Sequence, residues 1–342
     1  MKKLLLLAAI ILSSCAQKEF KNKIKPVVIE MPGINSLSIR ALEVAADSLV
    51  ALSASGSTFA YSKDMGNTWT VKKIDTLNLE YRSLAILDSA LIVVNVGSPA
   101  KVLRSVDFGD SWETVYIDTS ANAFYNSIKF SNNKNGIISG DPQEGCLSIL
   151  KSKDAGKTWF KQECEDALIL DDGEAQFAAS NTCIEYKGSN IWIATGGKNS
   201  RIIKSSDNGG SWKSIDVDFI KGKEMTGIYS VDFYDEKRGV IVGGDWHEMC
   251  SNDYNKLYTL DGGETWIDEK DFNVGYLSCA QYKPDSDAEI IYALSKQGIA
   301  RSLDGGKIWE YISNEKDLYT FRFQNDSTII AAGKGKLVRL NI

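Results

Sequence analysis

The sequence is poor in histidine, and it has no excess of basic residues. His247 is the only histidine among 342 residues and no Cys-x-x-Cys pair occurs, so we expect no metal site. A Ser-His-Asp triad would have to use His247, and the Gly-x-Ser-x-Gly motif is absent. Acidic residues outnumber basic ones by 45 to 39, and no basic run follows the first few residues, which argues against a nucleic-acid partner. Nothing in the sequence predicts a cofactor.

The first fifteen residues differ from the rest of the chain. Lys2 and Lys3 precede an apolar run over residues 4–12, which is too short to span a membrane but has the form of a secretory signal. The segment Leu-Ser-Ser-Cys that ends at Cys15 is similar to the lipobox of bacterial lipoproteins, in which the cysteine is acylated. We therefore expect a signal peptide over residues 1–14, then the lipidated Cys15 and a polar tether over residues 15–25. This predicts a protein of the bacterial cell envelope, at the outer membrane on its periplasmic or surface side, with the lipid as its membrane contact.

One eight-residue pattern recurs six times along the chain. It begins with Ser or Thr and has Asp third, Gly fifth and Trp eighth, and the copies span residues 62–69, 105–112, 152–159, 205–212, 259–266 and 302–309. Each copy predicts a tight turn, in which Asp accepts backbone N–H groups, Gly supplies a left-handed conformation and Trp begins the next strand. The pattern resembles the Asp-box, or BNR repeat, of sialidases and other β-propellers. The resemblance implies structural, not catalytic, roles for Asp64, Asp107, Asp154, Asp207, Asp261 and Asp304.

The spacing of the copies predicts the architecture. Successive aspartates are 43, 47, 53, 54 and 43 residues apart, which is the length of a four-stranded propeller blade. Three further strands are expected after the sixth copy, and residues 25–31 can supply a fourth that closes the ring. The sequence therefore predicts an all-β, monomeric propeller over residues 26–342, with seven four-stranded antiparallel blades. A six-bladed ring of the sialidase type is the alternative.

Two cysteines flank the third repeat. A hairpin that pairs Ser152 with Trp159 nearly pairs Cys146 with Cys164, and an exported protein permits disulfides. We predict a disulfide between these two residues, with two free buried thiols as the alternative.

Propeller geometry also sorts the loops between two faces. The repeat turns occupy one face, whereas the entries to the innermost strands and the loops after the second strands gather on the other, which we call the loop-rich face. Long loops on a rigid scaffold are where binding residues concentrate. The candidate contact residues on this face are Arg40, Arg82, Tyr125, Asp141, Glu174, Asp245 and Trp246. The alternative is that these loops are merely solvated and charged.

Two kinds of chemistry fit these candidates. Arg40 and Arg82 could clamp a carboxylate or a phosphate through paired hydrogen bonds. Asp141, Glu174 and Asp245 could supply the acid and the base or nucleophile of a glycoside hydrolase. A true sialidase is less favoured, because the Arg-Ile-Pro motif of that family is absent from the N-terminal region.

Further segments resemble the family of photosystem II stability and assembly factors. Residues 230–235 (SVDFYD) and 239–244 (GVIVGG) look like its blade signature, and residues 139–142 and 173–180 look like signatures of its bacterial branch. The resemblance spans residues 36–342 and implies a seven-bladed docking propeller, in which Arg40 and Arg82 would correspond to an arginine-rich patch. We therefore expect a lipid-anchored, non-catalytic scaffold for an envelope protein or glycan, with a carbohydrate-active enzyme as the alternative.

Overall fold

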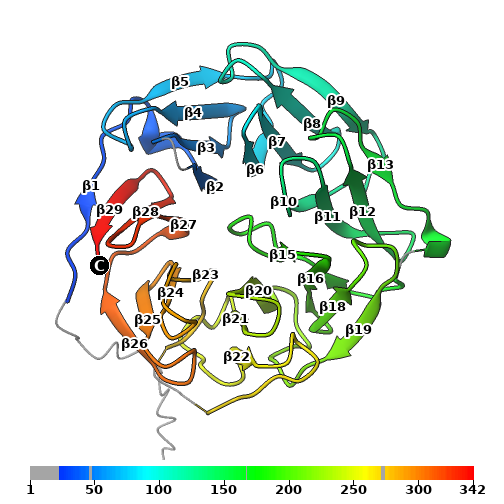
Figure 1. The fold of residues 1–342 in the computed structure, drawn as a ribbon, viewed down its shortest axis with the longest axis vertical. Helices are drawn as coiled ribbons and strands as arrows, with labels where there is room; N and C mark the ends of the chain where they lie inside the picture. Colours follow the sequence, from blue (N-terminus) through cyan, green and yellow to red (C-terminus); the bar gives the residue numbers. More distant parts are fainter. Residues whose placement is uncertain (1–22, 46–47, 167, 271–273) are drawn as a thin grey trace, which may run out of the picture.

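The computed structural model describes residues 23–45, 48–166, 168–270 and 274–342. The predicted signal peptide, Cys15 and most of the tether lie outside these ranges. The strands within them form seven antiparallel sheets, arranged as blades around one axis (Figure 1). The structure thus confirms the predicted seven-bladed propeller. No helix in the described ranges is long and apolar enough to cross a membrane.

Each blade begins with its innermost strand and continues outward. Blades 1 to 3 consist of β2 (Ile39–Val44), β3 (Val50–Ala54), β4 (Thr58–Ser62) and β5 (Thr70–Lys73); β6 (Glu80–Leu87), β7 (Ala90–Val96), β8 (Ala100–Ser105) and β9 (Glu113–Asp118); and β10 (Tyr125–Phe130), β11 (Gly136–Gln143), β12 (Cys146–Ser152) and β13 (Phe160–Lys161). Blades 4 to 6 consist of β15 (Ile184–Lys187), β16 (Asn190–Ala194), β18 (Arg201–Ser205) and β19 (Lys213–Asp216); β20 (Thr226–Phe233), β21 (Gly239–Asp245) and β22 (Lys256–Thr259); and β23 (Cys279–Tyr282), β24 (Ile291–Ser295), β25 (Gly298–Ser302) and β26 (Trp309–Ser313).

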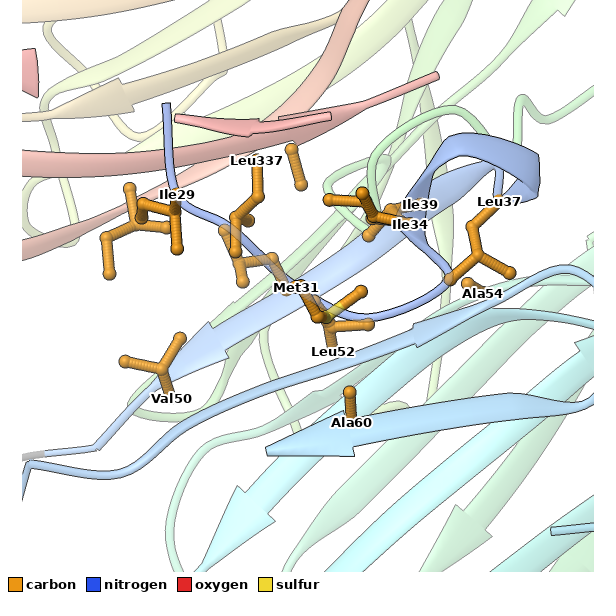
Figure 2. Packing of buried hydrophobic residues seen from close by; sticks show 13 residues of the cluster. Ile29, Met31, Ile34, Leu37, Ile39, Val50, Leu52, Ala54, Ala60 and Leu337 are labelled. Atoms are coloured by element: carbon orange, nitrogen blue, oxygen red, sulfur yellow. The ribbon is translucent and has the colours of Figure 1, made fainter. Parts of the chain in front are cut away.

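Blade 7 closes the ring with strands from both ends of the described chain. It contains β27 (Leu318–Asn325), β28 (Thr328–Gly333) and β29 (Leu337–Asn341), followed outward by β1 (Val27–Val28). Beyond β1, the side chains of Ile29 and Met31 are buried together with Leu337 and with apolar residues of blade 1 (Figure 2). The N-terminal strand therefore covers the open edge of β29, and the residues after it seal the junction of blades 7 and 1.

The six repeat turns share one hydrogen-bond pattern. In the third, Ser152 Oγ donates to Asp154 Oδ1 at 2.9 Å, and the N–H of Thr158 donates to the same oxygen at 3.0 Å. The backbone N–H of Ala155, which follows Asp154, donates to Lys134 O at 3.1 Å. Lys134 lies in the turn between β10 and β11, so the repeat turn is on the same face of the propeller as that turn. The equivalent bonds from the first and seventh residues recur in the other five turns. These aspartates are thus committed to holding their own turns.

Blade 4 departs from the prediction. The sequence predicts that its innermost strand spans residues 176–186, but β15 begins at Ile184. Just upstream, β14 (Glu174–Ala175) pairs with β17 (Gly196–Gly197), which in turn pairs with β20, so the sheet of blade 5 gains two short inner strands. Residues 176–183, which we call the channel segment, run instead toward the middle of the ring (Figure 1).

The channel segment hydrogen-bonds to innermost strands all around the ring. The segment belongs to no strand of the sheets, so its polar groups are not satisfied by a regular ladder and need other partners. Asn181 serves blades 1 to 3: its Nδ2 donates to Glu43 Oε1 at 3.2 Å and to Leu84 O at 2.9 Å, and its Oδ1 accepts the N–H of Ile128 at 3.0 Å.

Three further bonds reach blades 5 to 7. Val231 N donates to Thr182 O at 2.8 Å, Ser180 Oγ donates to Ser278 O at 2.7 Å, and Thr320 Oγ1 donates to Ser180 O at 3.0 Å. One segment of blade 4 therefore ties the six other blades together at the axis.

The disulfide predicted from the hairpin spacing is present. Cys146, at the start of β12, is bonded to Cys164 in the short 3-10 helix η2 (Cys164–Asp166), and their Cα atoms are 5.6 Å apart. Lys151 of β12 pairs with Phe160 of β13. This is the same register as the predicted pairing of Ser152 with Trp159. Cys183 and Cys279 are free and buried.

Candidate functional site

A hollow of about 350 Å³ opens on the loop-rich face, where the innermost strands begin. The channel segment contributes much of its lining, and the rest comes from blades 1, 2, 3 and 5. The lining residues are Arg40, Arg82, Phe124, Asp141, Gly173, Ala175, Gln176, Phe177, Ala178, Ala179, Gly197, Glu224, Met225, Tyr229 and Trp246. The structure thus brings together four of the seven predicted contact residues, namely Arg40, Arg82, Asp141 and Trp246.

Arg40 is a cation of this hollow that has no carboxylate partner among the described residues. Its guanidinium lies 4.1 Å from the ring centroid of Tyr319, and its Nη1 donates to Ala179 O at 3.3 Å. Its Nε is buried and makes no hydrogen bond within the described part of the chain. Burial and the nearby Arg82 lower the pKa of Arg40. Arg82, in contrast, pairs with Glu80, and its Nε lies 2.8 Å from Glu80 Oε2. An anion entering the hollow would therefore gain most from Arg40.

Asp141 fixes another part of the lining. Its Oδ1 accepts the side-chain N–H of Asn126 at 2.8 Å and the backbone N–H of Gln176 at 3.0 Å. Burial raises the pKa of Asp141, and these two hydrogen bonds partly offset that rise. The side chain of Gln176 also bonds to Gly140 O at 2.6 Å and to Ser139 Oγ at 2.7 Å. Asp141 is thus bound to the start of the channel segment.

Aromatic rings give the hollow a rigid apolar surface. The rings of Phe177 and Tyr229 stack with centroids 4.0 Å apart and planes inclined by 10°. Tyr276 meets Tyr229 and Trp246 edge to face, at centroid distances of 4.8 and 5.6 Å. The ammonium of Lys296 lies 4.4 Å from the ring centroid of Trp246. Because packing already fixes these rings, an apolar group that bound against them would order little further protein.

The three remaining predicted residues do not line the hollow. Tyr125 is buried, and its hydroxyl donates to Asp118 Oδ2 at 3.0 Å. Glu174 is buried and accepts the Nε and Nη2 groups of Arg201 at 2.9 and 2.7 Å. Asp245 is buried too, and its Oδ1 accepts two backbone N–H groups of the loop after it at 2.7 and 3.1 Å. Of the three carboxylates suggested for hydrolysis, Asp141 is therefore the one that reaches the hollow.

Sequence reasoning missed the apolar lining of the hollow. Residues 177–179 were expected inside a strand, where apolar side chains indicate core packing, and Phe124 and Met225 carry no distinguishing pattern. One signal was present, because the four polar or small residues 180–183 (Ser-Asn-Thr-Cys) interrupt the alternation that a half-buried strand requires. Within the described ranges, no cluster of His, Cys, Asp and Glu could hold a metal ion.

Comparisons with known proteins identify the fold. No protein-family model matches the sequence, and no curated protein is significantly similar to it. A structure of YCF48 bound to a D1 peptide is similar over 94% of this chain and 96% of its own, with 15% identity and a TM-score of 0.66. YCF48 from Cyanidioschyzon merolae is similar over 93% of this chain and 99% of its own, with 14% identity and a TM-score of 0.67. The GH74 enzyme of Niastella koreensis, with 15% identity and a TM-score of 0.61, is matched over 86% of this chain but only 50% of its own. At these identities the likeness shows a shared propeller fold.

Proposed function

We propose that this protein is a non-catalytic scaffold that binds a polypeptide partner through the hollow on its loop-rich face. The observation that carries the proposal is Arg40, a cation with no carboxylate partner among the described residues, beside the stacked rings of Phe177 and Tyr229. The similar structure of YCF48 bound to a D1 peptide supports a peptide as the type of partner.

The partner segment would present a carboxylate next to a large apolar side chain. The carboxylate would accept hydrogen bonds from the guanidinium of Arg40, which pairs with no carboxylate among the described residues. The apolar side chain would lie against Phe177, Tyr229 and Trp246. Binding to such a rigid surface loses little entropy on the scaffold's side.

The scaffold would be held in the bacterial envelope by a lipid on Cys15, with the residues before β1 as its tether. The lipobox-like segment before Cys15 supports this part of the proposal. Metabolic labelling with a radioactive fatty acid tests it, because the label should be lost in Cys15→Ser.

Selection from a displayed library of random peptides tests the peptide-binding function. We expect the selected peptides to be enriched in acidic and aromatic residues, and Arg40→Gln to weaken their binding about tenfold or more in fluorescence polarisation, since a charged hydrogen bond is lost. Arg301→Gln removes the same charge from β25, where Arg301 pairs with Glu310, and should leave the affinity unchanged. Peptides that bind Arg40→Gln as tightly as the native protein would disprove the proposed site.

A glycoside hydrolase is less well supported. Glu174 and Asp245 are occupied by bonds within the fold, which leaves Asp141 without either of the carboxylate partners that the sequence suggested. The likeness to the GH74 enzyme covers half of that enzyme and concerns the fold.

A further inference from the structure

A second hollow, of about 330 Å³, lies at the opposite end of the axis, where the innermost strands end. We call it the exit hollow. It is lined by Val44, Lys187, Asp232, Phe233, Tyr234, Gln281, Tyr282, Pro284, Arg322 and Phe323. It shares no lining residue with the hollow on the loop-rich face, so a ligand here would be independent of the proposed peptide site.

The two cations that line the exit hollow are already occupied. Arg322 forms a two-pronged ion pair with Glu43, with Nε–Oε2 and Nη2–Oε1 distances of 3.0 and 2.6 Å. Its Nη1 donates to Thr320 Oγ1 at 3.1 Å and to a backbone carbonyl at 2.7 Å. The ammonium of Lys187 donates to the carbonyl oxygen of Phe233, the last residue of β20, and to that of Tyr234 at 2.9 Å. These cations therefore have few N–H groups left for a ligand.

Asp232 is in the opposite situation. Its Oδ2 accepts the backbone N–H of Tyr282 at 2.6 Å, but within the described residues it forms no ion pair. The nearby Lys129 is paired with Glu185, at an Nζ–Oε2 distance of 2.7 Å. Burial and then repulsion by Glu185 raise the pKa of Asp232 to about 6, and Lys129 and Lys187 oppose that rise. Asp232 is partly buried. A partly desolvated carboxylate without an ion-pair partner is costly, and a bound cation would lower that cost.

The walls around Asp232 also suit a cation. Tyr234 and Tyr282 meet edge to face with centroids 5.8 Å apart, and Phe323 adds a third ring to the lining. The guanidinium of Arg238 already lies over the Tyr234 ring, 5.0 Å from its centroid. Aromatic faces attract ammonium groups, and more strongly where water is excluded.

We propose that the exit hollow binds a primary ammonium group, with the carboxylate of Asp232 as its counter-ion. The rings of Tyr234, Tyr282 and Phe323 would surround the methylene groups next to the nitrogen. The same chemistry is offered by a free alkylamine and by a lysine side chain of another polypeptide.

Titration of the purified protein with n-butylammonium, followed by NMR chemical shifts, tests this site. n-Butanol and pentanoate have the same butyl chain without the positive charge. We expect saturable binding of n-butylammonium and at least about tenfold weaker binding of both analogues, because neither can pair with Asp232. Equal binding of n-butanol, or no saturable binding of n-butylammonium, would overturn the proposal.

Two variants sharpen the test. Asp232→Asn should weaken n-butylammonium binding about tenfold or more, whereas Asp326→Asn should leave it unchanged. Asp326→Asn is a matched control because it removes the same negative charge, and Asp326 lies exposed in the turn between β27 and β28. Unchanged binding in Asp232→Asn would refute the role of this carboxylate.

The native protein provides a check that does not depend on the variants folding. The charged groups that act on Asp232 are Glu185, Lys129, Lys187 and Arg322, and Glu43 in turn acts on Lys129 and Arg322. The pKa of Asp232, about 6, lies within reach of experiment. Binding should therefore weaken as the pH falls through about 6, since protonated Asp232 cannot pair with ammonium. Affinity that does not change with pH over this range would contradict the proposal.

A final comparison distinguishes the source of the ammonium group. A short peptide with a central lysine is titrated beside the same peptide with norleucine. Tighter binding of the lysine peptide than of n-butylammonium supports a polypeptide ligand, whereas tighter binding of n-butylammonium supports a free amine. Equal binding of the lysine and norleucine peptides would count against an ammonium site.

Discussion

At the scale of single residues, Glu174 shows how a charged side chain on the loop-rich face can serve the fold. Its carboxylate is buried and accepts bonds from Arg201 and from Thr195 Oγ1 at 2.5 Å. The sequence placed Glu174 on the correct face but could not reveal Arg201, which comes 27 residues later on another strand. A carboxylate that awaits a substrate and one that is paired inside the fold look the same in a sequence.

Arg201→Met should therefore destabilise the protein strongly. It leaves the Glu174 carboxylate buried without its counter-ion, which costs about 3 to 5 kcal/mol of unfolding free energy. In a Glu174→Gln background the same change should cost much less, because no buried charge is left unpaired. Urea unfolding of the native protein, Arg201→Met, Glu174→Gln and the double variant measures this coupling. Arg301→Met, which breaks a more exposed ion pair with Glu310, should cost about 1 kcal/mol or less. A loss in Arg201→Met no larger than in this control would contradict the argument.

At the scale of elements, the strands of the blades were predictable and the channel segment was not. One repeat follows the third strand of each blade from blade 1 to blade 6, so the number of repeats gives six blades. The remaining strands at the two ends of the propeller predict the seventh blade. The hydrogen bonds of Asn181, in contrast, go to residues 53 to 138 positions away in the chain. No local pattern encodes such partners. For the same reason the sequence did not predict the apolar lining of the hollow on the loop-rich face, although it predicted candidate contact residues on that face.

Asn181→Ala should weaken the whole ring. The change removes three hydrogen bonds, two of which satisfy the backbone C=O of Leu84 and N–H of Ile128, and this loss costs about 2 to 4 kcal/mol. Glu43 keeps its ion pair with Arg322. Asn181 also has a left-handed φ of 61°, so part of the loss comes from the backbone.

Asn208→Ala provides the control for that backbone part. Asn208 has a φ of 59° but is exposed in a repeat turn, where its side chain accepts one bond from Tyr186. Asn208→Ala should lower the unfolding free energy by about 1 kcal/mol, through the backbone and the one lost hydrogen bond. This loss should be clearly smaller than the loss in Asn181→Ala. Equal losses for the two variants in thermal unfolding would show that the channel segment does not tie the blades together.

At the scale of the whole molecule, closure depends on a strand from the far end of the chain. Val27 and Val28 pair with β29, and the N–H of Ile29 donates to Leu337 O at 2.9 Å. Ile29 and Met31 then fill the junction between blades 7 and 1 (Figure 2). Without these residues the edge of β29 would be open to another chain.

A protein that begins at residue 33 should be less stable than one that begins at residue 23. Loss of the buried Ile29 and Met31 side chains should lower the unfolding free energy by about 4 kcal/mol or more. The exposed edge should also cause association that grows with concentration, which light scattering coupled to size-exclusion chromatography can detect. If the shorter protein is monomeric and unfolds at the same temperature as the longer one, the N-terminal strand does not close the ring.

The channel segment has a consequence for the order in which the protein folds. In a solenoid each repeat contacts only its neighbours, so repeats can form and be lost one at a time. Here Ser180 bonds to Thr320, 140 residues later, and Ser278 lies 98 residues later. During synthesis, the partners of Asn181 in blades 1 to 3 already exist when the channel segment appears, but the partners of Ser180 in blades 6 and 7 do not. The hydrogen bonds of the channel segment can therefore all form only after the last blade has been synthesised. We expect the ring to fold and unfold as one cooperative unit.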